Sequence, residues 1–463
     1  MMLTRLLFIL FLCSVAALLF GIGVLAQHYG HPAALYVDSA LKAYDAEKER
    51  LPERAIDPKE TDSMMTGKRV EWNKQLAYDG LTLITIRYST TAYLLDMEGN
   101  IRHRWDVPFK KAWKKPRHVS TLVSNEWIYI EKAVAFPNGD LLLAYTAAGV
   151  TPYGYGMVKV DKDSRVIWKY SDNTHHDFSI DPATGNILAL THRLINSNEP
   201  GYRWSTNYML EDFVVLLSPA GKELQRISVF DAFYDSPYRL LLHDYHKNVM
   251  EWDRLHTNHV SIITEEMARH FPMFKAGQYL LSLRNMDALA VLDPQSKKIV
   301  WAFNGLWRAQ HSPQLLENGN ILLFDNKGHV IKDQIFSRVL EFNPKTLGVE
   351  WSYNGSKELP FYTDAFGRVQ RLDNGNTLIT ESMTGRVFEI TPAGKTVWQF
   401  KLPMVRRKLD DKHPQPYQKE DCIYVNTEEP LRFDPSLSGI IVSATRYNAD
   451  ALPFIHEKLH KRK

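Results

Sequence analysis

Between residues 75 and 450, short apolar stretches alternate with polar turns in a pattern that recurs six times. Each repeat reads as two apolar strands joined by a tight turn, followed by a variable loop and two further strands joined by a polar turn. Asn, Asp and Gly tolerate positive φ, so dipeptides containing them favour tight hairpins. The first turns fall at Asp79-Gly80, Asn138-Gly139, Gly185-Asn186, Ala276-Gly277, Asn318-Gly319 and Asn374-Gly375.

The second turn of each repeat precedes a strand that closes the unit. These turns lie at Glu98-Gly99, Lys162-Asp163, Ala220-Gly221, Gln295-Ser296, Thr346-Leu347 and Ala393-Gly394. Five closing strands carry a tryptophan, namely Trp105, Trp168, Trp301, Trp351 and Trp398, and Ile227 takes that place in the third repeat. Four-stranded units at a spacing of roughly 40 to 60 residues are typical of β-propellers. The sequence therefore predicts an all-β fold, a six-bladed β-propeller over residues 75–450.

Two segments depart from the repeat. Residues 230–255 lengthen the interval between the third and fourth repeats and are rich in aromatic side chains, as functional loops often are. The stretch from Gly439 to Tyr447 reads as one more strand after the sixth repeat. We expect this strand to complete the first blade, because pairing the two ends of the chain removes an open sheet edge.

The amino-terminal segment is a membrane-spanning candidate. No charge occurs from Leu6 to Ala26, and Arg5 precedes this stretch. At ~1.5 Å per residue such a helix crosses the ~30 Å hydrocarbon layer. Its length favours an uncleaved anchor over a secretory signal peptide, although Val24-Leu25-Ala26 could be a cleavage site.

These features divide the chain into four parts. We expect a transmembrane signal anchor over residues 1–26, a charged and partly helical stalk over 27–74, the propeller over 75–450 and a basic tail over 451–463. Because Arg5 and the amino terminus mark the cytoplasmic end of the anchor, the propeller should lie outside the cytoplasm.

Composition narrows the classes of function. The chain has 463 residues, of which 44% are hydrophobic and 24% charged, and this excludes intrinsic disorder. Lys and Arg number 56 against 53 Asp and Glu, so there is no broad basic field and we expect no nucleic-acid partner. The two cysteines, Cys13 and Cys422, exclude a disulfide framework, a CxxC redox centre and a cysteine-based zinc site.

Histidines recur at matched positions of the repeat. His176 lies nine residues before Gly185 and His311 eight before Gly319, and His256 takes the same place once a longer fourth hairpin is allowed for. Because the first strand of each blade lines the central channel, these side chains should meet at one rim.

The second strands should return to the same rim. A residue about seven past the first turn reaches it, and this counting selects Arg284, His192 and Asn326, while Asn258 shares a strand face with His256. Three histidines could bind a metal ion. Arg284 would repel a cation, so we expect no metal and no other cofactor, and an oxyanion instead.

At these residues the sequence resembles the bacterial arylsulfate sulfotransferases. The matching stretches are His175-His176-Asp177, the run from Asp253 to Asn258, the run from Ser282 to Asn285, and Gln310-His311-Ser312 followed by NGNILLFDN. The resemblance implies a propeller that is periplasmic and held at the inner membrane by a single pass. It also implies transfer of a sulfuryl group from an aryl sulfate ester to a phenolic acceptor through a sulfohistidine, without a nucleotide donor.

The resemblance also assigns roles. His311 is similar to the histidine that accepts the sulfuryl group, while His176, His256, Arg284 and Asn258 resemble the sulfate-binding set. Counting does not settle which of His175 and His176 faces inward, and we choose His176. We add His175, His192 and Asn326 as further substrate-binding candidates. Two departures are the insertion after Asn258 and the lack of the close cysteine pair found in some members.

Two other functions compete with this hypothesis. The first is a non-catalytic, membrane-tethered propeller acting as a binding or assembly module, since a propeller fold alone carries no function. The second is a quinoprotein-type dehydrogenase, which is disfavoured because histidine and arginine stand where calcium-binding carboxylates would be needed. The absence of a GxxxxGK[ST] loop is consistent with a reaction that uses no nucleotide donor. The sequence carries no signal for an oligomeric state.

Overall fold

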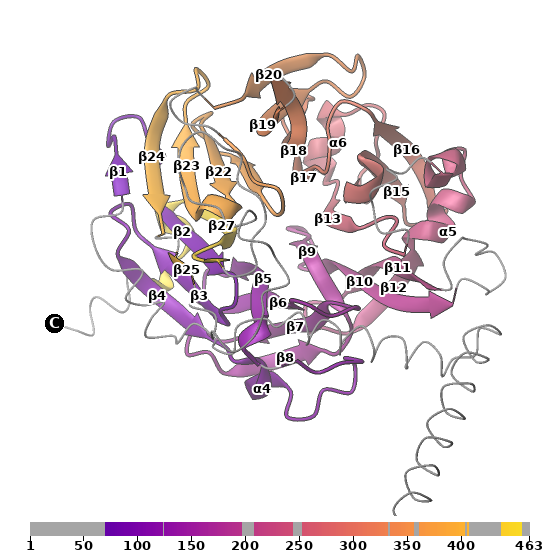
Figure 1. The fold of residues 1–463 in the computed structure, drawn as a ribbon, viewed down its shortest axis with the longest axis horizontal. Coiled ribbons are helices and arrows are strands. Elements are labelled where there is room, and N and C mark those ends of the chain that lie inside the picture. Colours follow the sequence, from indigo (N-terminus) through magenta and orange to yellow (C-terminus); the bar gives the residue numbers. More distant parts are fainter. Residues whose placement is uncertain are drawn as a thin grey trace, which may run out of the picture.

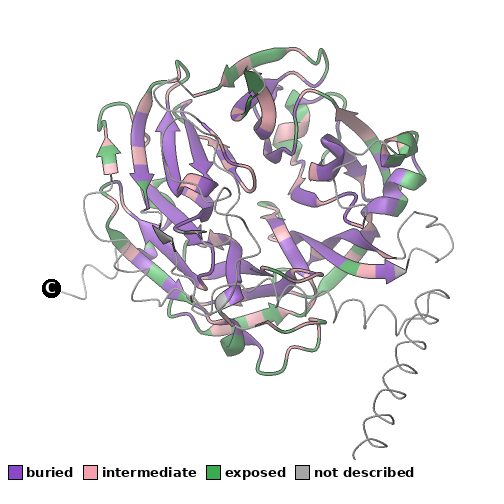
Figure 2. Cartoon of the chain, viewed as in Figure 1, coloured by how far each residue is buried: buried purple, intermediate pink, exposed green. Residues whose placement is uncertain are grey.

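The computed structural model describes residues 70–123, 125–196, 208–243, 252–331, 334–355, 361–402, 405–406 and 437–455. Six antiparallel sheets surround a central axis, so the predicted six-bladed β-propeller is confirmed (Figure 1). Figure 2 shows that buried residues dominate the strands near the axis and that exposed residues gather toward the periphery. Any site on the axis is therefore enclosed by the inner strands.

Four blades are built from consecutive strands that run in chain order from the axis outward. Blade 2 contains β5 (Ile128–Ala135), β6 (Leu141–Ala147), β7 (Gly154–Val160) and β8 (Val166–Tyr170). Blade 3 contains β9 (Thr174–Ile180), β10 (Ile187–Asn196), β11 (Tyr208–Leu217) and β12 (Glu223–Ser228). Blade 4 contains β13 (Thr257–Ile262), β14 (Tyr279–Leu283), β15 (Ala288–Asp293) and β16 (Lys298–Asn304). Blade 5 contains β17 (His311–Leu315), β18 (Ile321–Ile331), β19 (Gln334–Phe342) and β20 (Val349–Tyr353).

The two ends of the chain close the ring. Blade 6 contains β21 (Arg368–Arg371), β22 (Thr377–Glu381), β23 (Arg386–Ile390) and β24 (Thr396–Lys401), with β1 (Val70–Trp72) outside β24. Blade 1 contains β27 (Ile441–Tyr447), β2 (Leu81–Ile86), β3 (Thr91–Leu95) and β4 (Ile101–Asp106). A short separate ladder joins β25 (Val405–Arg406) to β26 (Leu437–Ser438).

The closing strand lies where the sequence places it. β27 pairs with β2 from Leu81 opposite Tyr447 to Ile86 opposite Ile441, which confirms the predicted pairing of the chain ends. The hairpin expected at Asp79-Gly80 is wrong. β1 pairs with β24 in blade 6, so the inner strand of blade 1 comes from the carboxy-terminal segment instead.

Four of the five tryptophans in the closing strands connect neighbouring blades. The Trp105 indole donates to Gly139 O at 2.9 Å and the Trp398 indole to Met97 O at 2.9 Å. Trp168 and Trp351 likewise donate to carbonyls of the next blade, Pro219 O at 3.1 Å and Pro392 O at 2.8 Å. In blade 3, where Ile227 replaces the tryptophan, Gln225 Nε2 donates to Pro294 O at 3.1 Å. A side-chain bond to the adjacent blade is thus kept even where the indole is missing.

Short helices occupy the connections between strands. They are α4 (Phe109–Ala112), α5 (Val229–Tyr234) and α6 (Glu265–His270), with 3-10 turns η1 (Asn125–Trp127), η2 (Arg239–His243), η3 (Arg284–Met286), η4 (Ser382–Thr384) and η6 (Ala449–Ala451). The aromatic side chains of Phe230 and Phe233 in α5 are buried in the hydrophobic core shared by blades 3 and 4. These two rings of the insertion are therefore packing residues.

No helix in the described part of the chain is long and apolar enough to cross a bilayer. The predicted anchor over residues 1–26 lies outside the described residues, as do residues 27–69 of the predicted stalk and residues 456–463 of the predicted tail.

Candidate active site

A small pocket on the propeller axis, called the cavity below, is lined by residues from every blade. Its wall consists of Glu131 on β5, His176 on β9, Asn258 on β13, His311 and Ser312 on β17, Phe366 and Gly367 followed by Arg368 on β21, and Val442 on β27. Polar and ionisable side chains from separate blades thus converge on one point, as the repeat counting predicts for His176, Asn258 and His311.

β-Bulges place most of these side chains. In five of the six inner strands the pairing with the second strand shifts register at the cavity. The irregular steps include Glu131, the stretch from His175 to Asp177, Asn258, Ser312 and Val442. A bulge adds a residue without a ladder partner and turns its side chain away from the regular alternation.

The backbone is strained at two of these bulges and just before β13. His176, His256 and Ser312 have φ values of 50°, 46° and 51°. Positive φ costs a non-glycine residue roughly 1 to 2 kcal/mol, and such residues cluster at functional sites. The surrounding sheets hold these three residues in conformations that serve the cavity rather than the ladder.

His311 is fixed in one neutral tautomer. Its Nδ1 lies 2.7 Å from Asn326 Oδ1 and 3.0 Å from Ala309 O, and both of these atoms are acceptors. Asn326 Nδ2 donates to Thr363 O and Phe366 O, at 2.9 and 2.8 Å, so the orientation of the amide is set. Nδ1 of His311 must therefore carry the proton, and Nε2 keeps its lone pair.

Burial and a nearby cation keep this imidazole uncharged. Desolvation, followed by the charge of Arg284, lowers the pKa of His311 to about 3. Arg284 begins η3, and its backbone N–H donates to His256 O at 3.2 Å. Its guanidinium donates to Asn285 Oδ1 at 2.8 Å. The positive charge thus acts at His311 from the adjacent blade.

His256 and His176 lie together beside the cavity, with ring centroids 4.7 Å apart. His256 Nδ1 lies 2.5 Å from Asp253 Oδ2, a pairing that fixes the ring and directs Nε2 away from the carboxylate. Burial, and then the charge of His256, hold the pKa of His176 well below its ordinary range. His176 is therefore a neutral donor or acceptor, not a cation.

Asn258 is held against blade 5. Its Nδ2 donates to Gln310 O at 2.8 Å, while its Oδ1 is buried without a hydrogen-bond partner. An unpaired buried oxygen costs free energy unless a ligand or water satisfies it. The amide oxygen can therefore accept a hydrogen bond from a donor in the cavity.

A buried ion cluster supports the wall from behind. Asp177 pairs with Lys132, with His259 Nδ1 at 2.6 Å and with Arg368 at 3.5 Å. Lys132, His259 and Arg368 overcome the effect of burial and hold the pKa of Asp177 well below its usual range. The second terminal nitrogen of Arg368 donates to His176 O at 3.1 Å, which ties blade 6 to the bulge in blade 3.

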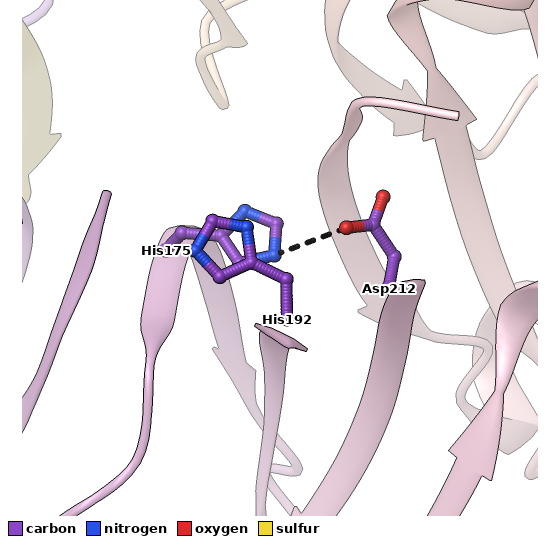
Figure 3. A group of neighbouring side chains, drawn as sticks. All are labelled: His175, His192 and Asp212. Carbon is purple, nitrogen blue, oxygen red and sulfur yellow. Dashed lines mark ion pairs between the residues drawn. The ribbon is translucent and has the colours of Figure 1, made fainter. Parts of the chain in front are cut away.

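Of the predicted site residues, five are not part of the cavity wall, namely Arg284, His256, His175, His192 and Asn326. His175 and His192 are fully buried behind His176, and their rings stack with centroids 4.1 Å apart and an interplanar angle of 20° (Figure 3). His175 Nδ1 lies 2.8 Å from His176 Nδ1. Asn326 contacts His311 rather than the cavity. The substrate-binding roles given to His175, His192 and Asn326 stay predictions.

Within the described part of the chain, one group could hold a metal ion: His175, His192 and Asp212 each offer a ligand atom within 4.8 Å of the others. His175 Nε2 is 3.6 Å from Asp212 Oδ1 (Figure 3). Stacked imidazoles are a poor arrangement for two ligands of one ion, whose rings point toward the metal from separate directions. Burial and the neighbouring Asp253 raise the pKa of Asp212 to about 8, so this carboxyl holds a proton at neutral pH.

Three functional candidates were missed by sequence reasoning. Glu131 lies eight residues before Gly139 and Arg368 seven before Gly375, so the counting that selects His311 would also have selected them. Tyr153 is the third, and its ring contacts those of His176 and His256, with centroids 5.4 and 6.0 Å away. No periodic signal marks Tyr153, because it precedes the third strand of its blade.

The fold and this site together define a class of protein, a β-propeller whose axial cavity is lined by neutral histidines and an arginine. A sequence profile described as arylsulfotransferase (ASST) matches residues 132–402, more than half of the chain. The chain belongs to the arylsulfotransferase family, which confirms the resemblance inferred from its motifs. A comparison with curated proteins finds no match.

Solved structures are similar to this chain at low sequence identity. A protein of unknown function from Bacteroides caccae is 13% identical over 70% of this chain and 93% of that chain, with a TM-score of 0.44. The Cps50 (Swd1) β-propeller domain of Myceliophteria thermophila is 12% identical over 73% and 88% of the two chains, with a TM-score of 0.39. Virginiamycin B lyase from Staphylococcus aureus is 9% identical over 58% and 69%, with a TM-score of 0.33.

Proposed function

We propose that this protein is an arylsulfate sulfotransferase that moves a sulfuryl group from an aryl sulfate ester to a phenolic acceptor through a sulfohistidine, without a nucleotide donor. The observation that carries the proposal is the fixed tautomer of His311. Asn326 and Ala309 both accept from Nδ1, so Nε2 is the unprotonated nitrogen of a neutral imidazole that lines the axial cavity. A nucleophile needs such a free electron pair.

In the first half-reaction, Nε2 of His311 attacks the sulfur of the ester. The S–N bond forms as the bond between sulfur and the aryl oxygen breaks, and the phenolate leaves with the electron pair. In the second half-reaction, the oxygen of a second phenol attacks the same sulfur, the S–N bond breaks, and His311 regains its lone pair. The acceptor loses one proton and the leaving phenolate gains one, so the cycle balances.

The other groups hold the sulfuryl oxygens. The transferred group carries its charge on equivalent oxygens, so a protein assists chiefly by positioning it and stabilising that charge, as in phosphoryl transfer. Arg284 supplies a positive charge next to His311, His176 and His256 supply ring N–H groups, and Asn258 has one amide hydrogen beyond its bond to Gln310 O. The neutral His311 beside the charged Arg284 fits a site in which the histidine is the nucleophile and the arginine stabilises the negative charge.

The location of the enzyme is part of the proposal. The uncharged stretch from Leu6 to Ala26 supports an inner-membrane anchor, with the propeller in the periplasm. A reporter that is active only outside the cytoplasm, fused after residue 463, should be active if this topology is correct. An inactive reporter on a well-expressed fusion would contradict it.

The test of activity uses the full-length protein in detergent with p-nitrophenyl sulfate and phenol. We expect nitrophenol release that depends on the enzyme, and a loss of at least about 10³-fold in His311→Ala. His270→Ala is the matched control, because His270 is exposed on α6. Equal activity in His311→Ala and the wild type would remove His311 from its role. No release by the wild type from any aryl sulfate would overturn the proposed function.

A further inference from the structure

A carboxylate stands in the wall of a cavity that should bind an anion. Glu131 is only 4% exposed, and it lines the cavity together with His176 and His311. It is the bulged residue of β5, since Ile130 pairs with Tyr145 and Lys132 with Ala144, which leaves Glu131 without a partner in the ladder. The bulge directs a buried acid toward the axis, where a charged carboxylate would repel a sulfate ester.

The surroundings of Glu131 allow both protonation states. The Tyr129 hydroxyl donates a hydrogen bond to the carboxylate, and the charges of Arg368 and Arg87 face it from blades 6 and 1. Burial outweighs these stabilising contacts and raises the pKa of Glu131 to about 7. The Thr146 and Tyr153 side chains complete its polar neighbours, and Val442 of β27 is the apolar one in the cavity wall. Near neutral pH this group can therefore give or take a proton.

Sulfuryl transfer between phenols needs such a group. A phenol has a pKa of about 10 and attacks poorly until its proton is removed, and an unactivated phenolate leaves poorly unless it is protonated. His311 cannot exchange this proton, because its Nδ1–H is held by Asn326 and its Nε2 is bonded to sulfur in the intermediate. A second group in the same cavity must do so.

We propose that Glu131 is the general acid and base of the reaction, a role that rests on the proposed function. The protonated Glu131 gives its proton to the aryl oxygen as the bond between sulfur and oxygen breaks. The resulting carboxylate then takes the proton of the acceptor phenol as its oxygen bonds to sulfur and the S–N bond breaks. The neutral acid also lets the anionic ester enter without repulsion.

His256 is the competing candidate for this proton. Its Nδ1 is paired with Asp253, and its ring packs against His176, so it belongs to the group that surrounds the sulfuryl oxygens. Glu131 approaches from blade 2, on a different side of the axis from blade 4. The two candidates can be told apart by which variant, at Glu131 or at His256, slows transfer to phenol more than transfer to an acidic phenol.

The experiment compares Glu131→Gln with the full-length wild type in each half-reaction. The first readout is the burst of nitrophenol from p-nitrophenyl sulfate, whose leaving group needs no proton. The second is transfer to phenol and to a nitrophenol acceptor of much lower pKa. We expect Glu131→Gln to lower transfer to phenol by roughly 10² to 10⁴-fold. The burst and the transfer to the acidic acceptor should fall far less.

The pH profile gives an independent readout. In the wild type, transfer to phenol should rise with pH and level off above about 7, as Glu131 loses its proton. The rise should vanish in Glu131→Gln. Glu341→Gln is the matched control, because Glu341 is also buried but binds Asn320 and Arg371 away from the cavity. This variant should keep the wild-type ratio of rates for the two acceptors.

The other outcomes decide against the inference. If Glu131→Gln slows the burst and both acceptors equally, Glu131 is a structural residue. If acceptor selectivity appears in His256→Gln instead, the proton passes through His256. If thermal unfolding shows that Glu131→Gln is not folded, Glu131→Asp provides the test. Its shorter side chain holds the carboxylate farther from the acceptor, so transfer to phenol should again fall more than transfer to the nitrophenol acceptor, but by a smaller factor. If the wild type releases no nitrophenol, the proposed function itself is wrong. If the wild type is active and only the selectivity of Glu131→Gln is missing, the role of Glu131 alone is wrong.

Discussion

One nitrogen of His311 decides the chemistry of the site. Two acceptors share its Nδ1–H, and the amide of Asn326 cannot rotate without giving up its bonds to two carbonyl oxygens. A neutral acceptor at Nδ1 keeps the ring uncharged, whereas a carboxylate there would favour the imidazolium. Asparagine at position 326 therefore suits a nucleophile better than the aspartate found in many histidine dyads.

Asn326→Asp should reverse this arrangement. The new carboxylate would raise the pKa of His311 from about 3 toward neutrality, because it stabilises the charged ring. At saturating ester, the wild-type burst should stay flat as the pH falls from 8 to 5. In the variant the burst should decline across this range, since a protonated Nε2 cannot attack. Stopped-flow measurement of nitrophenol release checks this.

The stability of Asn326→Asp must be known before its pH profile is interpreted. Asn326→Asp also removes the donors to Thr363 O and Phe366 O, so a loss of about 1 to 3 kcal/mol of stability is expected and should be measured separately. A flat pH profile with full stability would show that Asn326 does not control the protonation of His311.

The buried cluster of His175, His192 and Asp212 leads to a prediction about metal removal. Burial lowers the pKa of His175 to about 3, holds the pKa of His192 well below its ordinary range and raises the pKa of Asp212 to about 8, so the neutral form of each group is favoured at neutral pH. We expect prolonged dialysis against EDTA to leave both turnover and the thermal midpoint unchanged. Elemental analysis of the purified protein should find less than one transition-metal ion per chain. A stoichiometric ion lost on dialysis, with a lower thermal midpoint, would contradict this.

At the scale of the strands, the sequence predicts the regular pairing but not the bulges. Alternation and turn spacing predict the blades, the rim and the position of His311. An inserted residue reverses the alternation locally, and nothing in the pattern of apolar residues marks it. For that reason counting could not choose between His175 and His176. The structure places His176 in the cavity wall and His175 behind it, and Glu131 lies on a bulge of the same kind.

The junctions between blades make a prediction about stability. Trp398 is 1% exposed and its indole bonds Met97 O across the junction of blades 6 and 1, whereas the equivalent bond from Trp351 to Pro392 O is exposed to solvent. Trp398→Phe should lower the free energy of unfolding by about 1 to 3 kcal/mol, since a buried carbonyl loses its donor. Trp351→Phe should cost about 1 kcal/mol or less. Urea unfolding of both variants tests this, and equal losses would argue against burial as the cause.

For the molecule as a whole, the carboxy-terminal strand serves both the fold and the site. β27 is the inner strand of blade 1, and its Val442 sits on the bulge that lines the cavity. Without β27, β2 would present an open edge at the axis, and open edges recruit other chains. The ring of blades closes only when β27 pairs with β2, so the complete cavity depends on a contact between distant parts of the sequence.

A chain that stops at residue 436 tests this dependence. We expect this truncated protein to lose activity and to elute as aggregates in size-exclusion chromatography, because removal of β27 exposes the edge of β2. A peptide spanning residues 437–455, when present during refolding, should restore part of the activity and of the monomeric protein. The reason is that the peptide contains β27, the strand that pairs with β2. A peptide of the same composition in scrambled order is the control. A truncated protein that is monomeric and fully active would show that five complete blades and an open one suffice to hold the cavity.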